Sequence, residues 1–531
     1  MKTSRKKFLI VTGAFVALVV LFFVEEHFRG RWQLARYRKT LIAQGEKLSI
    51  AECLPAPVLE EDNAFFALRN ASARQPGRGL SDLAPPTFRF VAPGKVMPSL
   101  TLTQWQHSSS TKRSPSNITW AVFEQPRKDF AEPLAEARAA LRKPGFDARL
   151  PYHRGFNIAM SHVTQLKSIG LQFSALTVMD LHAGRLDVAL DNLDDLLTLG
   201  RRMAAEPIII SQLVRNALAA IAFNATWLAL HTPGWSDPQL ARLQKLWEEQ
   251  EMLTPMTRAM EMERAIMLLT YEQMRESGGQ AADVFGLVQG GGIGAGSAGT
   301  NAFNSVGQFI DYLGEHHEEL IERNVMLPVW QFTWAQQDEL NYLHLIQRMI
   351  DGGRAAARER SSQPNTRAVR EVAEKIKGLR GLGRLRHLLT ALTVPALENT
   401  MRRTLIVQVQ REMVLAAIAL QRYELRHGKP AADLPAMVPE FLRELPRDYF
   451  AAAPLRYHPG GRDQFVLYSF GANEKDDGGD ARPAEKGAAR FNLQSGLDLV
   501  WPRPASTSEI EAFEAKENPQ HQAGSLKRAG N

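Results

Sequence analysis

The densest group of potentially reactive side chains lies near the C-terminus, in the stretch LYSFGANEKDDGGD from Leu467 to Asp480. An alternating apolar segment, typical of a β-strand, runs there into a turn that holds four carboxylates and two adjacent glycines. Two interpretations fit this composition. In one, Asp477-Gly478 reverses the chain in a solvated turn; in the other, the carboxylates hold a cation.

An EF-hand is not among the cation sites that this stretch can form. Asn473, Lys475, Asp477 and Gly478 would take positions one, three, five and six of the EF-hand loop. A lysine side chain offers only hydrogen-bond donors, so Lys475 cannot ligate a cation at position three.

Other constellations in the chain lack the context that enzyme chemistry needs. Gly294, Gly296 and Gly299 have the spacing of a dinucleotide-binding loop, but no strand precedes them. His316 and His317 are adjacent, whereas zinc ligands on one helix face stand three or four residues apart. We therefore predict no catalytic residues and do not expect an enzyme.

Charge is concentrated in one part of the chain. The 531 residues carry a formal net charge of +7, and Arg354 to Arg386 has ten cationic residues against three carboxylates. No aromatic residue interrupts this stretch, so a solvated helix face beside an anionic bilayer explains it better than a nucleic-acid site does. Cys53 is the only cysteine, which excludes an intrachain disulfide and a thiolate zinc cage.

The N-terminal residues 1–26 predict a membrane anchor. Phe8 to Val24 contains no charged residue, and as a helix it would span roughly 26 Å, close to the thickness of the bilayer hydrocarbon. No small-residue cleavage site follows, which favours an uncleaved anchor over a signal peptide. Cationic residues precede the segment while Glu25 and Glu26 follow it, which favours an exported body, although five cationic residues at 29–39 argue for the opposite orientation.

Helical periodicity dominates the chain beyond the anchor. We expect a juxtamembrane helix and an extended Pro-, Ser- and Gly-rich wrap at 27–130, then a helical body at 131–400 with a Gly-rich loop at 286–300. Apolar residues from Leu186 to Leu197 lie on one face of a helix that begins after Gly184. This helix and the one before it resemble a single tetratricopeptide hairpin.

A smaller module is predicted at 401–504. A helix from about Arg402 to Arg426 carries one continuous apolar seam and is ended by Gly428 and Pro430. Two short alternating segments, PLRYH and QFVLYSF, follow and are joined by a Gly-Gly turn that suits a hairpin. Residues 505–531 have the composition of a disordered tail.

The order of residues in this module resembles the periplasmic head of type II secretion major pseudopilins and related type IV pilin-like proteins. In that pattern a helix ending in Tyr, Gly and Pro leads to a Pro and Asp turn, a strand with Pro and Tyr, the motif YS-x-G-A-[DN], and an acidic Gly-rich loop closed by Asp and Trp. The matching residues are Tyr423, Gly428, Pro430, Pro446, Asp448, Pro454, Tyr457, Tyr468, Ser469, Gly471, Asn473, Asp476 to Asp480, Asp498 and Trp501. The whole chain also resembles long membrane-anchored proteins of planctomycete- and verrucomicrobial-type bacteria.

The resemblance to pseudopilins implies a calcium site in which the acidic loop wraps one Ca²⁺. Binding of a hard cation by several oxygen ligands would relieve the repulsion among the clustered carboxylates. Ala451–Ala453 replaces the Gly-containing turn of that family, and a long body separates anchor from head, so we do not expect this chain to polymerise. The implied calcium ligands are Asp476, Asp477, Asp480 and Asp498, with Asn473 and Ser469 as secondary ligands.

The sequence thus predicts a mainly α protein with an N-terminal transmembrane helix, a tetratricopeptide-like helical body and a small α+β pilin-like module with antiparallel strands. Three functions remain open: an exported scaffold or interaction protein of the bacterial inner membrane, an envelope enzyme assembled from distant residues, and a cytoplasm-facing adaptor that uses 354–386. We favour the scaffold, with a periplasmic body, unidentified protein partners and a bilayer contact through Phe8–Val24.

Overall fold

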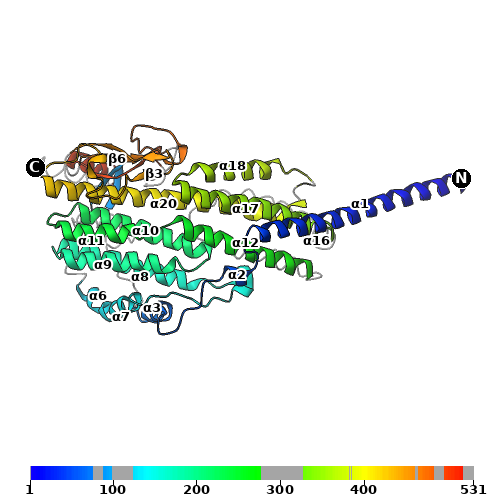
Figure 1. Ribbon diagram of the computed structural model, residues 1–531, viewed down its shortest axis with the longest axis horizontal. Helices are drawn as coiled ribbons and strands as arrows, with labels where there is room; N and C mark the ends of the chain where they lie inside the picture. Colours follow the sequence, from blue (N-terminus) through cyan, green and yellow to red (C-terminus); the bar gives the residue numbers. More distant parts are fainter. Residues whose placement is uncertain are drawn as a thin grey trace, which may run out of the picture.

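The computed structural model describes residues 2–75, 88–98, 124–276, 327–381, 383, 386–460, 464–483 and 496–517. The protein is mainly helical, as the sequence predicts, and its helices lie side by side in an elongated bundle (Figure 1). Small sheets cover the end of the bundle opposite the N-terminus (Figure 1). The predicted Gly-rich loop at 286–300 and the His316–His317 pair lie outside the described residues.

Helix α1 (Lys2–Ala43) is one uninterrupted helix of 42 residues that continues through the predicted boundary at residue 26. It is long and apolar enough to cross a membrane, and only 6% of its apolar window is buried. Its N-terminal half projects alone beyond the bundle (Figure 1). The helix is terminated just before Gly45, whose φ of +81° suits glycine, and Glu46 N–H donates to the Leu41 carbonyl at 3.0 Å.

The C-terminal half of α1 packs on the body through one seam. Glu26, Gly30, Leu34 and Leu41 are buried at helical spacing. They face α16 (Leu327–Thr333) and α17 (Ala335–Glu359), and Leu34 and Leu41 share a small apolar cluster with Leu268 and Leu343. A Cβ atom at Gly30 would come within 2.8 Å of Gln337 Cγ, so the glycine allows α1 and α17 to approach closely.

The body is built from long helices that pack side by side. Helices α8 and α9 form the hairpin predicted around Gly184, with Leu190, Leu193 and Leu197 buried; its tetratricopeptide resemblance stays a prediction. The second helix that is apolar enough to span a membrane, α10, is a core helix because 67% of its apolar window is buried. The elements are α2 (Ile50–Cys53), α3 (Ala64–Ala73), α6 (Glu124–Asp129), α7 (Ala131–Leu141), η2 (Tyr152–Asn157), α8 (Ser161–His182), α9 (Leu186–Met203), α10 (Ile209–Leu230), α11 (Asp237–Glu248), α12 (Leu253–Glu276), α18 (Gln363–Gly378) and α20 (Leu388–His427).

Helix α20 joins the body to the C-terminal module. It begins at residue 388 and therefore crosses the predicted boundary between 400 and 401, and it ends at Gly428 as predicted. Its apolar seam lies in the same hydrophobic core as the body helices and as Leu467, Leu499 and Trp501 of the module. Body and module consequently share one core, which the sequence boundaries did not predict.

Three small sheets lie within the described part of the chain. The two segments predicted as strands pair antiparallel as β5 (Arg456–His458) and β6 (Val466–Ser469), and β7 (Leu499–Val500) adds to β6. Part of the predicted wrap forms the β1–β2 hairpin, whose β2 pairs in parallel with β8. The remaining strands are β1 (Phe88–Ala92), β2 (Lys95–Pro98), β3 (Arg447–Asp448), β4 (Ala453–Pro454) and β8 (Arg503–Pro504).

The predicted disorder of the tail is wrong for Thr507–Glu517, which forms helix α21. Ser506 caps this helix: its N–H donates to Glu509 at 2.9 Å, and Glu509 N–H donates to the Ser506 hydroxyl at 3.3 Å. Glu509 also pairs with Lys95 of β2, which ties the helix to the hairpin. Composition alone missed these contacts because the hairpin is distant in sequence.

Candidate functional site

The most extensive buried polar structure that involves the anchor helix is a row of three carboxylates, Glu26, Glu339 and Glu46. Each lies where α1, or the segment after it, meets the body, and each is bound by two arginines. We call this row the carboxylate seam.

Glu26 marks the point where α1 leaves the body. It is 1% exposed and pairs with Arg29 of α1 and with Arg386, which directly precedes α20. Gln337 of α17 donates to both the backbone carbonyl and the carboxylate of Glu26, at 2.9 and 3.0 Å. One residue of α1 is thereby fixed to two other parts of the bundle.

Glu339 forms the second level of the seam. Its side chain is fully buried and accepts from Arg38 of α1 and from Arg275 of α12. One turn away the rings of Tyr37 and His344 stack with centroids 3.8 Å apart. Burial, followed by the charge of Lys375, lowers the pKa of His344, so the imidazole is neutral at pH 7 and stacks without a charge.

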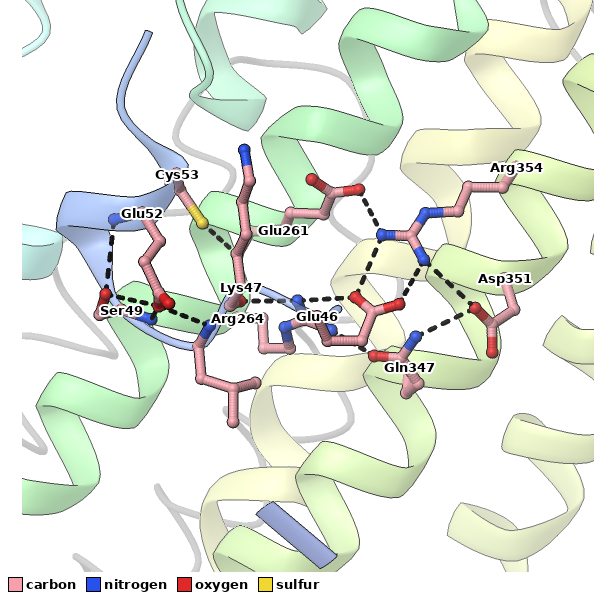
Figure 2. A network of polar contacts seen from close by, with 11 residues as sticks. Glu46, Lys47, Ser49, Glu52, Cys53, Glu261, Arg264, Gln347, Asp351 and Arg354 are labelled. Atoms are coloured by element: carbon pink, nitrogen blue, oxygen red, sulfur yellow. Dashed lines mark hydrogen bonds and ion pairs between the residues drawn. The ribbon is translucent and has the colours of Figure 1, made fainter. Parts of the chain in front are cut away.

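Glu46 forms the third level, directly after α1 ends (Figure 2). Its carboxylate lies between Arg264 of α12, 3.0 Å away, and Arg354 of α17. The Arg264 side chain is fully buried and also donates to the Lys47 carbonyl at 2.7 Å and to Gln347. Arg354 reaches Glu261 at 2.7 Å, so five charged and polar side chains close around the segment that follows α1.

The charges in this third level stabilise one another. Burial raises the pKa of Glu46, but hydrogen bonds and charge from Arg354 and Arg264 more than offset it, and the pKa lies below its ordinary value of 4.5. The hydrogen bond that Arg354 donates to the Glu46 carboxylate raises the pKa of Arg354 further above its ordinary range. At neutral pH the ion pairs are therefore complete.

The nearby thiol is not set up for nucleophilic chemistry. Cys53 of α2 donates weakly to the Glu261 carbonyl, with sulfur and oxygen 3.7 Å apart (Figure 2). Burial raises the pKa of the Cys53 thiol to about 11, so almost no thiolate exists at pH 7. The arrangement holds α1 and α2 against α12 and α17; it does not activate a reacting group.

The acidic loop predicted from the sequence is closed by Asp498. This carboxylate is 1% exposed and accepts backbone N–H groups from Gly479 at 2.7 Å, Asp480 at 3.2 Å and Asp477 at 3.4 Å. Positive φ angles of +72° at Gly478 and +81° at Gly479 aim these N–H groups inward. Burial raises the pKa of Asp498, and the three N–H donors oppose that rise.

The other predicted calcium ligands are engaged in hydrogen bonds and ion pairs, most of them with residues outside the predicted set. Tyr468 donates to Asp476 at 3.0 Å and the Asn473 amide donates to Asp477 at 2.7 Å. Asp480 pairs with Arg482, and Ser469 donates to the buried Asp448 at 2.7 Å. The six residues are therefore near in space but do not converge on a point where a cation would sit.

This donor arrangement does not fit a resident Ca²⁺ as it stands. Within the residues that the structure describes, no group of three or more His, Cys, Asp or Glu side chains is arranged to hold a metal ion. The calcium site stays a prediction that would require these side chains to turn. Asp448, noted in the sequence only as part of a pattern, instead anchors the loop: it is fully buried and also accepts from Phe470 N–H at 2.9 Å.

Asp180 and Glu261 also have structural partners. Asp180 of α8 binds Arg127 and Arg185 and accepts from Asn192 of α9, each at about 2.8 Å. Glu261 points to Arg354, whereas Glu263 on the same helix is 7% exposed in the interior. Two acids that are two residues apart thus face different surroundings.

The carboxylate seam was not predicted from the sequence. Two signals could have pointed to it: Glu25-Glu26 directly after an apolar segment, and Arg264 directly before the apolar run AIMLL of α12. A buried charge needs a partner, so both signals require acids and arginines that meet only in the folded chain.

No family model, curated protein or solved structure matches the chain.

Proposed function

We propose that the protein is a single-pass, membrane-anchored and exported scaffold or interaction protein whose anchor is rigidly joined to its body. The observation that carries this proposal is the continuity of α1, which runs without interruption from the exposed apolar half into the half held by the carboxylate seam. An enzyme can be tethered by a flexible linker, whereas a helix that is fixed at two levels and again in the segment after it holds the body at one height and tilt.

The bundle carries the C-terminal module away from the bilayer. Helix α20 starts beside the exit of α1, because Arg386 pairs with Glu26 and the Asp338 carboxylate accepts from Leu389 N–H at 2.8 Å. Its 40 residues rise roughly 60 Å, and the sheets pack at its other end. The pseudopilin-like module would then be presented to partners in secretion or envelope assembly at a fixed distance from the membrane.

The exposed cations of 354–386 are fewer than the sequence suggests. Arg354, Arg360 and Arg386 pair with carboxylates inside the protein. Among the other described cations, Arg367, Arg370, Lys375 and Lys377 are exposed on α18, where Ala368 and Val372 are buried. Arg358 of α17 and Arg380 after α18 are exposed as well. This internal use of charge favours the scaffold over the adaptor.

Two experiments test the proposal. A C-terminal reporter that is active only after export should be active, and a cytoplasmic reporter should be silent; the reverse result would overturn the exported scaffold. In the native bacterium, deletion of the protein should change the envelope or the secreted proteins. The full chain should restore them better than a matched chain with a flexible Gly-Ser insert after Val24, which keeps anchor and body but uncouples them. An unchanged envelope and secretome in the deletion strain would contradict the function.

A further inference from the structure

The surface around the exit of α1 is apolar and aromatic. Outside the anchor segment, the exposed large aromatic side chains are Phe28 and Trp32 of α1 and Phe332 of α16, 61%, 63% and 55% exposed within the described residues. His27 stacks on Phe332 with ring centroids 4.8 Å apart, so α16 places its aromatic residue at the height of residue 27. We call Phe28, Trp32 and Phe332 the aromatic collar.

The collar faces away from the bundle. Phe28 and Trp32 are four residues apart on one helix face, roughly opposite Glu26, Gly30 and Leu34 of the buried seam. Arg36 lies over the Trp32 ring, 5.6 Å from its centroid. Among the described residues, no core contact accounts for the exposed rings on this side, so their position calls for an external partner.

The height of the collar matches a lipid headgroup layer. If the hydrocarbon ends at Val24, the helical rise puts Phe28 roughly 6 Å and Trp32 roughly 12 Å beyond it. The headgroup layer on each side of a bilayer is roughly 5–8 Å thick. Phe28, and Phe332 beside residue 27, lie inside that layer, where interfacial helices bury Phe, Trp and Leu side chains, while Trp32 lies beyond its aqueous edge.

Charge on the same surface complements lipid phosphate. From residue 25 to residue 39, α1 carries five cationic side chains against two carboxylates, a net charge of +3. Arg31, Arg36 and Lys39 are exposed beside the collar, whereas Arg29 and Arg38 bind the carboxylate seam. The collar also continues the apolar surface of the anchor, since Phe22 is 48% exposed.

We propose that the end of the body at the α1 exit is seated in an anionic lipid headgroup layer, with Phe28 and Phe332 inserted at the interface and Arg31 against lipid phosphate, while Arg36, further from the bilayer, is attracted by the negative charge of the membrane surface. This inference rests on the proposed membrane anchor and extends it, because the bilayer then contacts the folded body as well as Phe8–Val24. Two elements of the body, α1 and α16, would share the contact, so the membrane would set the tilt of the whole bundle.

The test uses the full chain with Cys53→Ser and one new cysteine that carries an environment-sensitive fluorophore. Labels at Phe28→Cys and Phe332→Cys are compared with Leu425→Cys, a control that is 50% exposed near the far end of α20. In vesicles that contain phosphatidylglycerol, emission from the first two labels should shift to shorter wavelength and be protected from aqueous quencher, while the control should stay in water. Arg31→Gln/Arg36→Gln should reduce the shift in these vesicles and leave it unchanged in phosphatidylcholine vesicles.

Vesicle flotation separates the two proposals. If the chain floats with vesicles and the labels at 28 and 332 still report water, the seated body is wrong and the anchor stands. If the chain does not float, the anchor itself fails. Oxidation of the Trp32→Cys variant supplies a further outcome: efficient disulfide-linked dimers in vesicles would mean that a second copy covers this face, which would overturn the lipid contact.

Discussion

Glu46→Gln tests whether the carboxylate seam holds the segment after α1. Glu46 is 8% exposed at its side chain and Arg264 is fully buried, so the substitution leaves a buried guanidinium without its carboxylate. Breaking a buried pair in this way costs about 3–5 kcal/mol. Arg264 keeps the Lys47 carbonyl and Gln347 as acceptors, so we expect the lower end, about 3 kcal/mol.

The matched control is Glu371→Gln, which removes the same charge from a surface pair. Glu371 and Arg348 of that pair have side chains 49% and 57% exposed, and such pairs contribute about 0–1 kcal/mol. Amide hydrogen exchange over residues 44–53 is the assay, because it reports local opening directly. A cost of about 3 kcal/mol raises the open population roughly a hundredfold.

The same assay has a pH arm. The pKa of Glu46 is lowered in the folded protein, so its contribution is present above its ordinary pKa of 4.5 and is lost as the pH falls through the folded value. Protection of 44–53, corrected for intrinsic exchange, should fall in acid for the wild type and much less for Glu46→Gln. Equal protection in Glu46→Gln and Glu371→Gln at pH 7 would refute the reasoning.

Three other predictions follow from buried groups. Burial raises the pKa of Glu263 to about 7, so the folded protein loses stability as the pH rises from about 4.5 to 7. In urea denaturation, Glu263→Gln should stabilise the protein by up to about 3 kcal/mol above pH 7 and leave its stability unchanged below pH 4. An effect of the substitution that does not depend on pH would contradict this. Asp498→Asn should lower the free energy of unfolding by about 1–3 kcal/mol, because loop N–H groups lose acceptors. The melting temperature should fall by the same amount in Ca²⁺ and in chelator. A fall that is seen only in Ca²⁺ would support the calcium site instead. Cys53 should react with iodoacetamide at pH 8 roughly a hundredfold more slowly than a thiol of ordinary pKa. Equal rates in the folded and the urea-unfolded chain would show that the thiol is not buried as described.

Local patterns predicted the elements that depend on neighbouring residues. The apolar run after Lys7, the Gly184 turn, the α20 seam ending at Gly428 and the hairpin of β5 and β6 all depend on periodicity or on a turn residue. These signals do not need the rest of the chain, and the structure contains all four features.

Patterns did not predict the contacts between distant segments. Glu26 and Arg386 are 360 residues apart, and Glu46 and Arg354 are 308 apart, so no spacing rule connects them. The acidic loop shows the same limit: composition identified a cluster of carboxylates, but Asp498 closes the loop through backbone N–H groups whose direction depends on φ at Gly478 and Gly479. The shared core of body and module likewise depends on tertiary packing.

The central claim is that anchor and body form one rigid unit, and a distance distribution in a bilayer tests it most directly. One spin label is placed at Val16, exposed on the apolar half of α1, and a second at Arg348, exposed on α17, in a chain with Cys53→Ser. The structure predicts a single narrow distribution centred at roughly 40 Å, from the rise of α1 and the parallel packing of α17 on it. A broad distribution, as a flexible joint at residues 24–26 would give, would contradict the account.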